Sequence, residues 1–330
     1  MERIDVHVHC VPPAYREYCL QNDFAGKGHP DGMPAIPVGF TKNAGVGPAN
    51  SYRLDEALEH HQIHLSISSP GTHLTPSNDE EARSLTRRVN VDMSKICTDH
   101  PDHFLFFASL PLPDVEGSLS EIDYALDHLG AVGFQILTNS HGIYPGDPRF
   151  SRVFDKLSKR KAVVFIHPTS CNIHNWQDGS VTSEFMFDST RSLMSLLTSG
   201  MVKRCPGITF MACHCGGTFP PVMERIAQFS QVLLSPELRV TGEEVKEMLQ
   251  TRFFFDLAGV PFPDQIHGLL RLVNSSRLLY GSDYPYTPVP AVLAFAKKMD
   301  DGFESDFLSE VKENVYLKNA QELLARAPRH

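Results

Sequence analysis

Short apolar segments alternate with longer amphipathic segments along most of this chain. The apolar segments cover residues 4–9, 64–68, 104–109, 131–136, 162–167, 208–214, 253–256 and 277–283. Runs this short and this apolar predict buried strands of a parallel sheet. The segments between them predict helices over 54–59, 79–100, 115–129, 150–160, 184–204, 220–234 and 263–273, with further helices from about 290 and from about 305 to 325. Such alternation is typical of parallel α/β folds, and about eight strand signals favour a (β/α)8 TIM barrel over an open sheet.

The first strand is followed by a long segment, residues 12–48, which is rich in Gly, Pro and Asn and has a short helical piece at 14–21. Loops of this length in compact domains are usually functional or disordered. Because this one follows a strand with two histidines, we predict a functional N-terminal loop insertion. A length of 330 residues suits one large domain or two ordinary ones, and we expect a single barrel domain over 1–330.

Histidines and a carboxylate stand at the ends of four predicted strands. His7 and His9 lie two residues apart and therefore face the same side of the first strand, while His167, His214 and Asp283 close three later strands. Each has an ordinary alternative, since a histidine after a strand is often a hydrogen-bonded loop residue and an aspartate before a turn is usually a cap. Unrelated caps need not fall at the same end of successive buried strands. The pattern therefore predicts a metal centre at the C-terminal ends of the barrel strands.

The charge and composition of the chain argue against several classes of binding partner. The net charge is -9 and the 30 Lys and Arg residues are dispersed, which argues against nucleic acid or an anionic membrane surface as a partner. No apolar run approaches the ~18 residues of a membrane span. The first strand leaves no room for a signal peptide, so a cytoplasmic location is expected. There is no Gly-rich nucleotide fingerprint after a strand.

The seven cysteines are scattered and contain no C-x-x-C pair, so neither a zinc knuckle nor a disulfide framework is indicated. Cys213 and Cys215 flank His214. Because neighbouring strand residues face opposite sides, we expect both to point away from whatever His214 addresses and to be small core residues.

Several motifs together resemble a known family. They are Asp-x-His-x-His at 5–9, His167-Pro168, His214 followed by Gly216-Gly217, and Gly281-Ser282-Asp283-Tyr284-Pro285. This set resembles the amidohydrolase superfamily, and within it the branch of metal-dependent, non-oxidative decarboxylases that includes aminocarboxymuconate-semialdehyde decarboxylase and the hydroxybenzoate decarboxylases. Segments 66–74 and 281–288 are similar to fungal 6-methylsalicylate decarboxylases.

The resemblance implies a set of roles. One divalent metal ion, zinc or else manganese, would be bound by His7, His9, His167 and Asp283, with His214 and Asp283 as catalytic residues. Arg225 matches an arginine that reaches into a neighbouring subunit's site to bind the substrate carboxylate, which implies a homodimer or a higher homo-oligomer; its ordinary alternative is a solvated helix arginine. Arg53 precedes a helix much as a second substrate arginine does in the semialdehyde enzyme.

The function that the resemblance implies is decarboxylation of a small aromatic ortho-hydroxy carboxylic acid, with 6-methylsalicylate giving 3-methylphenol and CO2. Two alternatives stay open. The same metal could activate water, which would make the protein a mononuclear hydrolase of a lactone or amide. The second alternative is a non-catalytic barrel that binds a small molecule. Such a protein would not need an intact set of metal-binding residues.

Overall fold

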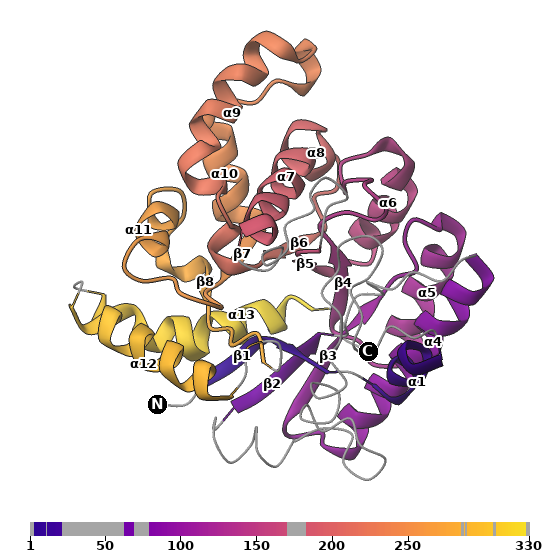
Figure 1. The fold of residues 1–330 in the computed structure, drawn as a ribbon. Coiled ribbons are helices and arrows are strands. Elements are labelled where there is room, and N and C mark those ends of the chain that lie inside the picture. The colour runs from indigo at the N-terminus through magenta and orange to yellow at the C-terminus, as the bar shows by residue number, and fades with distance from the viewer. Residues whose placement is uncertain are drawn as a thin grey trace.

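The computed structural model of the protein describes residues 3–10, 12–21, 63–68, 79–169, 183–284, 287, 289–305 and 308–327. Its centre is a parallel eight-stranded sheet in which the strands follow one another in chain order (Figure 1). They are β1 (Arg3–His9), β2 (Ile63–Ser68), β3 (Phe104–Ser109), β4 (Gly133–Leu137), β5 (Val163–His167), β6 (Thr209–Ala212), β7 (Phe253–Asp256) and β8 (Leu278–Leu279). Every predicted strand is present, although β8 is only two residues long.

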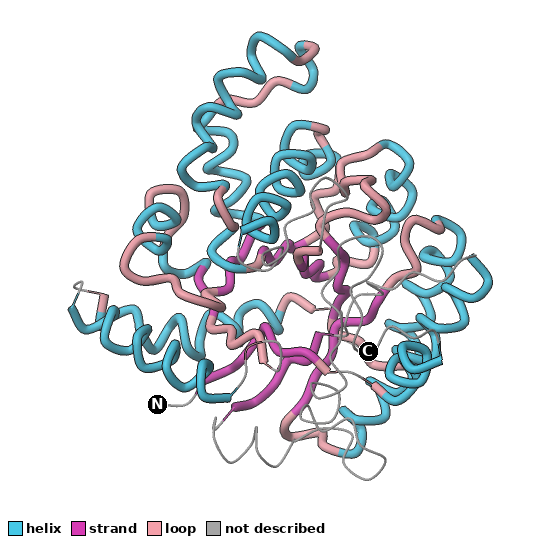
Figure 2. Tube along the Cα trace, in the orientation of Figure 1, coloured by secondary structure: helices cyan, strands magenta, loops and turns pink. Residues whose placement is uncertain are grey.

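The sheet closes through backbone hydrogen bonds between β1 and the segment that follows β8. The amide of Val6 donates to the carbonyl of Tyr280 at 3.1 Å, and the amide of His9 donates to the carbonyl of Tyr284 at 2.7 Å. Figure 2 shows the resulting ring of strands with helices around it. The predicted (β/α)8 TIM barrel is therefore confirmed.

The helices surround the ring. They are α1 (Pro13–Gln21), α4 (Asp79–Asp99), α5 (Val115–His128), α6 (Ser151–Lys159), α7 (Phe185–Thr198), α8 (Met201–Arg204), α9 (Phe219–Leu233), α10 (Gly242–Arg252), α11 (Gln265–Leu270), α12 (Val289–Ser305) and α13 (Asn319–Ala325). The single helix expected over 184–204 is divided at Gly200, whose φ of 75° cannot continue a right-handed helix. The end of the chain also differs, because a π-helical turn at Asn314–Lys318 precedes α13.

One helix, α10, was not predicted. It begins with a capping box in which the Thr241 side chain accepts from the Glu244 amide and the Glu244 side chain accepts from the Thr241 amide. Most of the insertion predicted at 12–48 and the helix predicted at 54–59 lie outside the described residues; of the insertion, the helical piece is seen as α1. None of the described helices is both long and apolar enough to cross a membrane.

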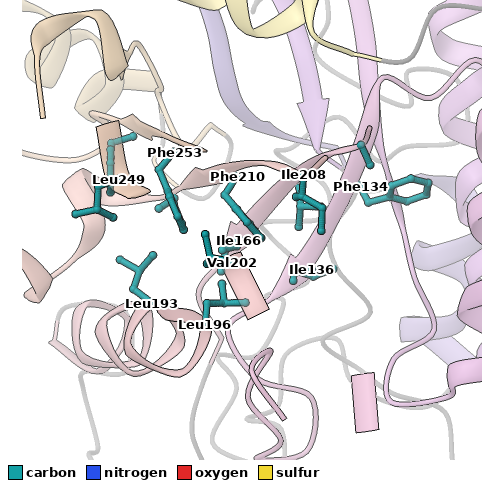
Figure 3. Close-up of a cluster of buried hydrophobic side chains, with 14 of the residues drawn as sticks. Phe134, Ile136, Ile166, Leu193, Leu196, Val202, Ile208, Phe210, Leu249 and Phe253 are labelled. Atoms are coloured by element: carbon teal, nitrogen blue, oxygen red, sulfur yellow. The ribbon is translucent and has the colours of Figure 1, made fainter. Parts of the chain in front are cut away.

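Apolar side chains fill both sides of the barrel wall. Phe253 and Phe255 of β7 belong to the large cluster between the strands and the surrounding helices, part of which Figure 3 shows. Phe254, between them, belongs to a second cluster that fills the inside of the barrel together with Phe165 of β5. This alternation means that Asp256, two residues after Phe254, also projects inward, at the C-terminal end of the strand.

Candidate metal centre

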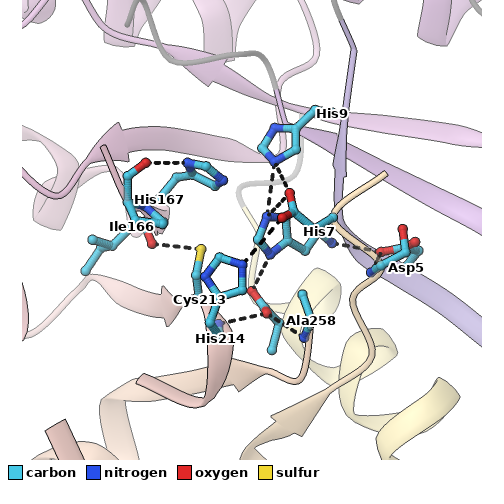
Figure 4. A network of polar contacts seen from close by, with 12 residues as sticks. Asp5, His7, His9, Ile166, His167, Cys213, His214 and Ala258 are labelled. Atoms are coloured by element: carbon cyan, nitrogen blue, oxygen red, sulfur yellow. Dashed lines mark hydrogen bonds and ion pairs between the residues drawn. The ribbon is translucent and has the colours of Figure 1, made fainter. Parts of the chain in front are cut away.

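Four predicted ligands lie together at the C-terminal end of the barrel. The ligand atoms of His7, His9, His167 and Asp283 are all within 4.8 Å of one another. The three histidines are at most 4 % exposed, and they come from β1 and β5 on different parts of the ring. Figure 4 shows His7 in the middle of the cluster, with His9 on one side and His214 on the other. Sequence-distant residues therefore form one compact polar site.

Three of these ligand atoms lie close to one another, in a buried cluster. His7 Nε2 lies 3.1 Å from His9 Nε2, and Asp283 Oδ1 lies 3.2 Å and 3.1 Å from these two nitrogens. Around an ion with bonds of about 2.0–2.1 Å, neighbouring ligand atoms stand about 3.0–3.4 Å apart. The observed spacing matches the edges of such a coordination shell. The residues therefore fit a single divalent ion.

His167 is oriented by a contact on its far side. Its Nδ1 lies 2.9 Å from the carbonyl oxygen of Pro168, which can only accept, so Nδ1 carries the proton. The neutral imidazole then keeps its lone pair on Nε2, the nitrogen that a metal ion would bind. The proline after β5 thus both ends the strand and fixes the orientation of the histidine.

Asp283 is brought to the site by a tight backbone turn. Its amide donates to the carbonyl of His7 at 2.7 Å, and its φ of 58° lies in the left-handed region. Gly281 permits this approach, since a Cβ at that position would lie 2.7 Å from the Cβ of His7. The glycine of the Gly-Ser-Asp motif is therefore required for close packing of β8 against β1.

His214 lies beside the four candidate ligands. Its Nε2 is 3.6 Å from Asp283 Oδ2, and the residue is 6 % exposed. It begins a 3-10 turn with a φ of 52°, and Cys215 follows with a φ of 56°. Left-handed backbone costs a non-glycine residue about 1–2 kcal/mol, which places local strain at the site. The glycines after His214 complete this turn.

A further buried carboxylate, Asp256, was not predicted as part of the site. Its Oδ2 lies 3.0 Å from His7 Nδ1, and its Oδ1 accepts from the amides of His214 and Ala258, each at 3.0 Å. The sequence did contain a signal for it, because Asp256 is a charged residue at the end of the apolar run Phe253–Phe255. It also stands two residues after Phe254 and therefore faces the same side of the strand.

Cys213 is a buried core residue as expected, but the expected direction of its side chain was wrong. Cys213 continues the inward register of β6 and lies against His7 inside the barrel, where its thiol donates to the carbonyl of Ile166 at 3.1 Å. The chain changes direction at His214, so the simple strand alternation assumed for the two cysteines ends there. Cys215 does belong to the outer core, as predicted.

Electrostatics favour positive charge at the centre of this cluster. Burial lowers the pKa of His9, which keeps that imidazole neutral. Burial would also lower the pKa of His7, but Asp256 and Asp283 raise it well above its ordinary value. Burial would raise the pKa of Asp283, yet His7 and the nearby histidines hold it well below its ordinary value. The two carboxylates therefore create a site suited to a cation.

Among the described residues, Arg225 makes no hydrogen bond or ion pair with this cluster. It is an exposed residue of α9, and its guanidinium carbon is 4.3 Å from the ring centroid of Phe229 on the same helix. The structure thus shows the arginine on the surface of α9. Arg53 lies outside the described residues.

Comparison with known proteins places this site in a family. The family model described as Amidohydrolase matches residues 4–326. The 6-methylsalicylic acid decarboxylase of Penicillium expansum is 32% identical over 333 residues, covering 99% of this chain and 97% of that protein. Decarboxylase yanB of Aspergillus niger is 30% identical over 342 residues, covering 99% of this chain and 88% of that protein.

Solved structures share the fold. The 5-carboxyvanillate decarboxylase from Sphingomonas paucimobilis has a TM-score of 0.83 at 16% identity, covering 98% of this chain and 99% of that one. The 5-carboxyvanillate decarboxylase from Novosphingobium aromaticivorans, complexed with manganese, has a TM-score of 0.79 at 20% identity, covering 98% and 96%. Since the family model spans nearly the whole chain and relatives of 30% identity or more cover 99% of it, this protein belongs to the amidohydrolase family, on its decarboxylase branch.

Proposed function

We propose that this protein binds one divalent metal ion through His7, His9, His167 and Asp283 and decarboxylates a small aromatic ortho-hydroxy acid. The observation that carries the proposal is the set of possible ligand atoms gathered at the C-terminal end of the barrel, three of which are held 3.1–3.2 Å apart. The chain is a carboxy-lyase of the branch to which its relatives belong. Among substrates we propose 6-methylsalicylate first, because two relatives that cover 99% of this chain are named for it.

The reaction needs a proton and no electrons. The ring carbon that bears the carboxylate takes up one proton. The bond between this carbon and the carboxylate carbon then breaks, its electron pair returns to the ring, and CO2 leaves. A bound ion would neutralise and orient the carboxylate and the ortho oxygen. The protein's own task is to hold the ring carbon beside a proton donor.

We infer that Asp283 and His214 manage that proton. Asp283 Oδ2 and His214 Nε2 are 3.6 Å apart, and the Asp283 side chain keeps an exposure of 18%. Either group can carry the proton to carbon, with the other as its neighbour in the exchange. Both are therefore proposed as catalytic residues.

For the ion itself we propose zinc, with manganese as the alternative. Three imidazole nitrogens and one carboxylate oxygen are a donor set that zinc favours, whereas manganese prefers more oxygen. Support for manganese comes from the structure of 5-carboxyvanillate decarboxylase from Novosphingobium aromaticivorans, which holds that metal.

We also propose that the protein acts as a homodimer or a higher homo-oligomer in the cytoplasm. Arg225 would then bind the substrate carboxylate in a neighbouring subunit. Support comes from its exposed position on α9, close to the exposed apolar side chains of Phe229, Val232 and Leu233 near the end of that helix. Charge-reversed Arg225→Glu should raise KM for substrate while leaving the metal content unchanged.

The test is a substrate panel that separates decarboxylation from hydrolysis. Metal-loaded protein is supplied with 6-methylsalicylate, other ortho-hydroxybenzoates, and lactone and amide substrates, and both CO2 and acid release are measured. We expect CO2 and 3-methylphenol from 6-methylsalicylate. CO2 from another hydroxybenzoate would correct the substrate only, and acid release from a lactone or amide without any CO2 would overturn the proposed reaction.

A further inference from the structure

The carboxylate of Asp256 contacts two residues of the candidate metal centre, His7 and His214. The residue is fully buried at the end of β7, and its carboxylate makes three contacts of 3.0 Å. Oδ2 faces the ring of His7, and Oδ1 accepts from the backbone amides of His214 and Ala258. Each oxygen therefore has a separate partner set.

The Oδ2 contact fixes the tautomer of His7. An ionised carboxylate can only accept, so His7 Nδ1 must donate, and in the neutral imidazole the lone pair then lies on Nε2. That nitrogen is the one 3.1 Å from His9 Nε2 and 3.2 Å from Asp283 Oδ1. The carboxylate thus directs the lone pair of His7 toward the proposed ion.

The Oδ1 contacts hold the strained turn at the end of β6. His214 has a left-handed φ of 52°, and its amide is anchored on Oδ1. The same oxygen anchors Ala258, whose Cβ would lie 3.3 Å from a Cβ at position 281, next to the turn that carries Asp283. One buried carboxylate is therefore linked to His7, to His214 and to the loop that packs beside the Asp283 turn.

We propose that Asp256 is a positioning residue that presents His7 Nε2 to the metal ion and holds the His214 turn beside it. This inference rests on the proposed metal centre, but it does not depend on which substrate is decarboxylated. It makes Asp256 necessary for tight metal binding although the carboxylate does not itself touch the ion.

A rival arrangement uses the same residues. The ligand atoms of His7, Cys213 and Asp256 also lie within 4.8 Å of one another, so an ion on the Nδ1 side of His7 would make Asp256 and Cys213 ligands. Against this, the Cys213 thiol donates its proton to the carbonyl of Ile166 at 3.1 Å, and a thiol must lose that proton to bind a metal. Cys213 therefore serves as the matched control, at equal depth and beside the same ring.

The experiment compares the zinc affinities of wild type, Asp256→Asn and Cys213→Ala by competition with a chromophoric chelator. If the side-chain oxygen of the asparagine still accepts from the backbone amides of His214 and Ala258, its NH2 group must point toward His7 Nδ1. This forces the Nε2–H tautomer, which cannot bind a metal. We expect Asp256→Asn to weaken zinc binding by about 10–100-fold and Cys213→Ala to stay within about threefold of wild type.

Two results would overturn the inference. Wild-type affinity in Asp256→Asn would show that the carboxylate does not position His7. Equal losses in both variants would place the ion on the Nδ1 side, as in the rival arrangement. If Asp256→Asn does not fold, a crystal structure of the zinc-loaded wild type decides the matter, because zinc on His7 Nε2 supports the role and zinc on Nδ1 refutes it. Wild type that binds zinc but releases no CO2 would refute the proposed reaction while leaving the Asp256 measurement valid.

Discussion

Gly281 gives a direct test of how the fold places Asp283. A Cβ added there would lie 2.7 Å from the Cβ of His7 and 3.3 Å from the Cβ atoms of Ala258 and Asp256. The closest of these neighbours are attached to strand backbone, so they cannot rotate away. Gly281→Ala must therefore push the end of β8 away from β1, and Asp283, two residues later, must move with it.

The expected cost follows from the tightness of this contact. Overpacking a buried site by one methyl group costs about 1–3 kcal/mol, and we expect the free energy of unfolding of the metal-free variant to fall by that amount in urea titrations. Zinc affinity should fall as well, because Asp283 Oδ1 now stands only 3.1–3.2 Å from two imidazole nitrogens and has little freedom to move.

Gly268→Ala is the matched control. Gly268 lies inside α11, and the nearest atom to its added Cβ would be the Cβ of Pro220 at an ordinary 3.6 Å. Alanine is the better helix former by about 1 kcal/mol, so this variant should be unchanged or slightly more stable. Equal stability and equal zinc affinity in Gly281→Ala and wild type would refute the steric account.

Other predictions separate the roles of the buried polar residues. His7→Ala should lose the metal, whereas His214→Ala should keep it and lose turnover by about 100-fold or more, as metal analysis and CO2 release will show; equal metal loss in both would contradict the division. Asp188→Ala removes the buried acceptor shared by three side chains that follow β4, and should lower the free energy of unfolding by about 3–5 kcal/mol, against about 0.5 kcal/mol for exposed Asp301→Ala. Burial raises the pKa of Asp5 from 3.8 to about 7, so the folded state holds this proton more tightly and stability falls as pH rises across that range. Asp5→Asn removes this titrating group, so between about pH 4 and pH 7 the free energy of unfolding of the metal-free variant, measured in urea, should fall less than that of the metal-free wild type, by up to about 4 kcal/mol. Parallel curves of unfolding free energy against pH for the two proteins would contradict this.

The sequence predicted the barrel well because its strands are short, apolar and buried on both faces. Such runs cannot be mistaken for surface segments, and β3 and β7 begin and end where the pattern placed them. The helix α10 was missed because its apolar positions are few, with Val245 and Leu249 as its buried residues. Its capping box was the signal that could have identified it.

The candidate site was harder to predict where the backbone leaves regular geometry. His7 and His9 face one side as the two-residue period requires, although the register of β1 against β2 shifts between Asp5 and Val8. Cys213 was placed on the wrong side because the turn at His214 interrupts that period. The position of Asp256 at the end of an apolar run indicated an inward carboxylate, but its contact with His7, 249 residues away, depends on closure of the ring and could not be predicted locally.

The most direct test of the central claim is to return metal to the chelated protein in steps, and to measure bound metal by elemental analysis and CO2 release from 6-methylsalicylate at each step. The account predicts no CO2 release from the metal-free protein, a rate that rises in proportion to bound metal, and a plateau at one ion per chain. A rate that does not change on chelation, or a plateau at two ions per chain, would contradict it.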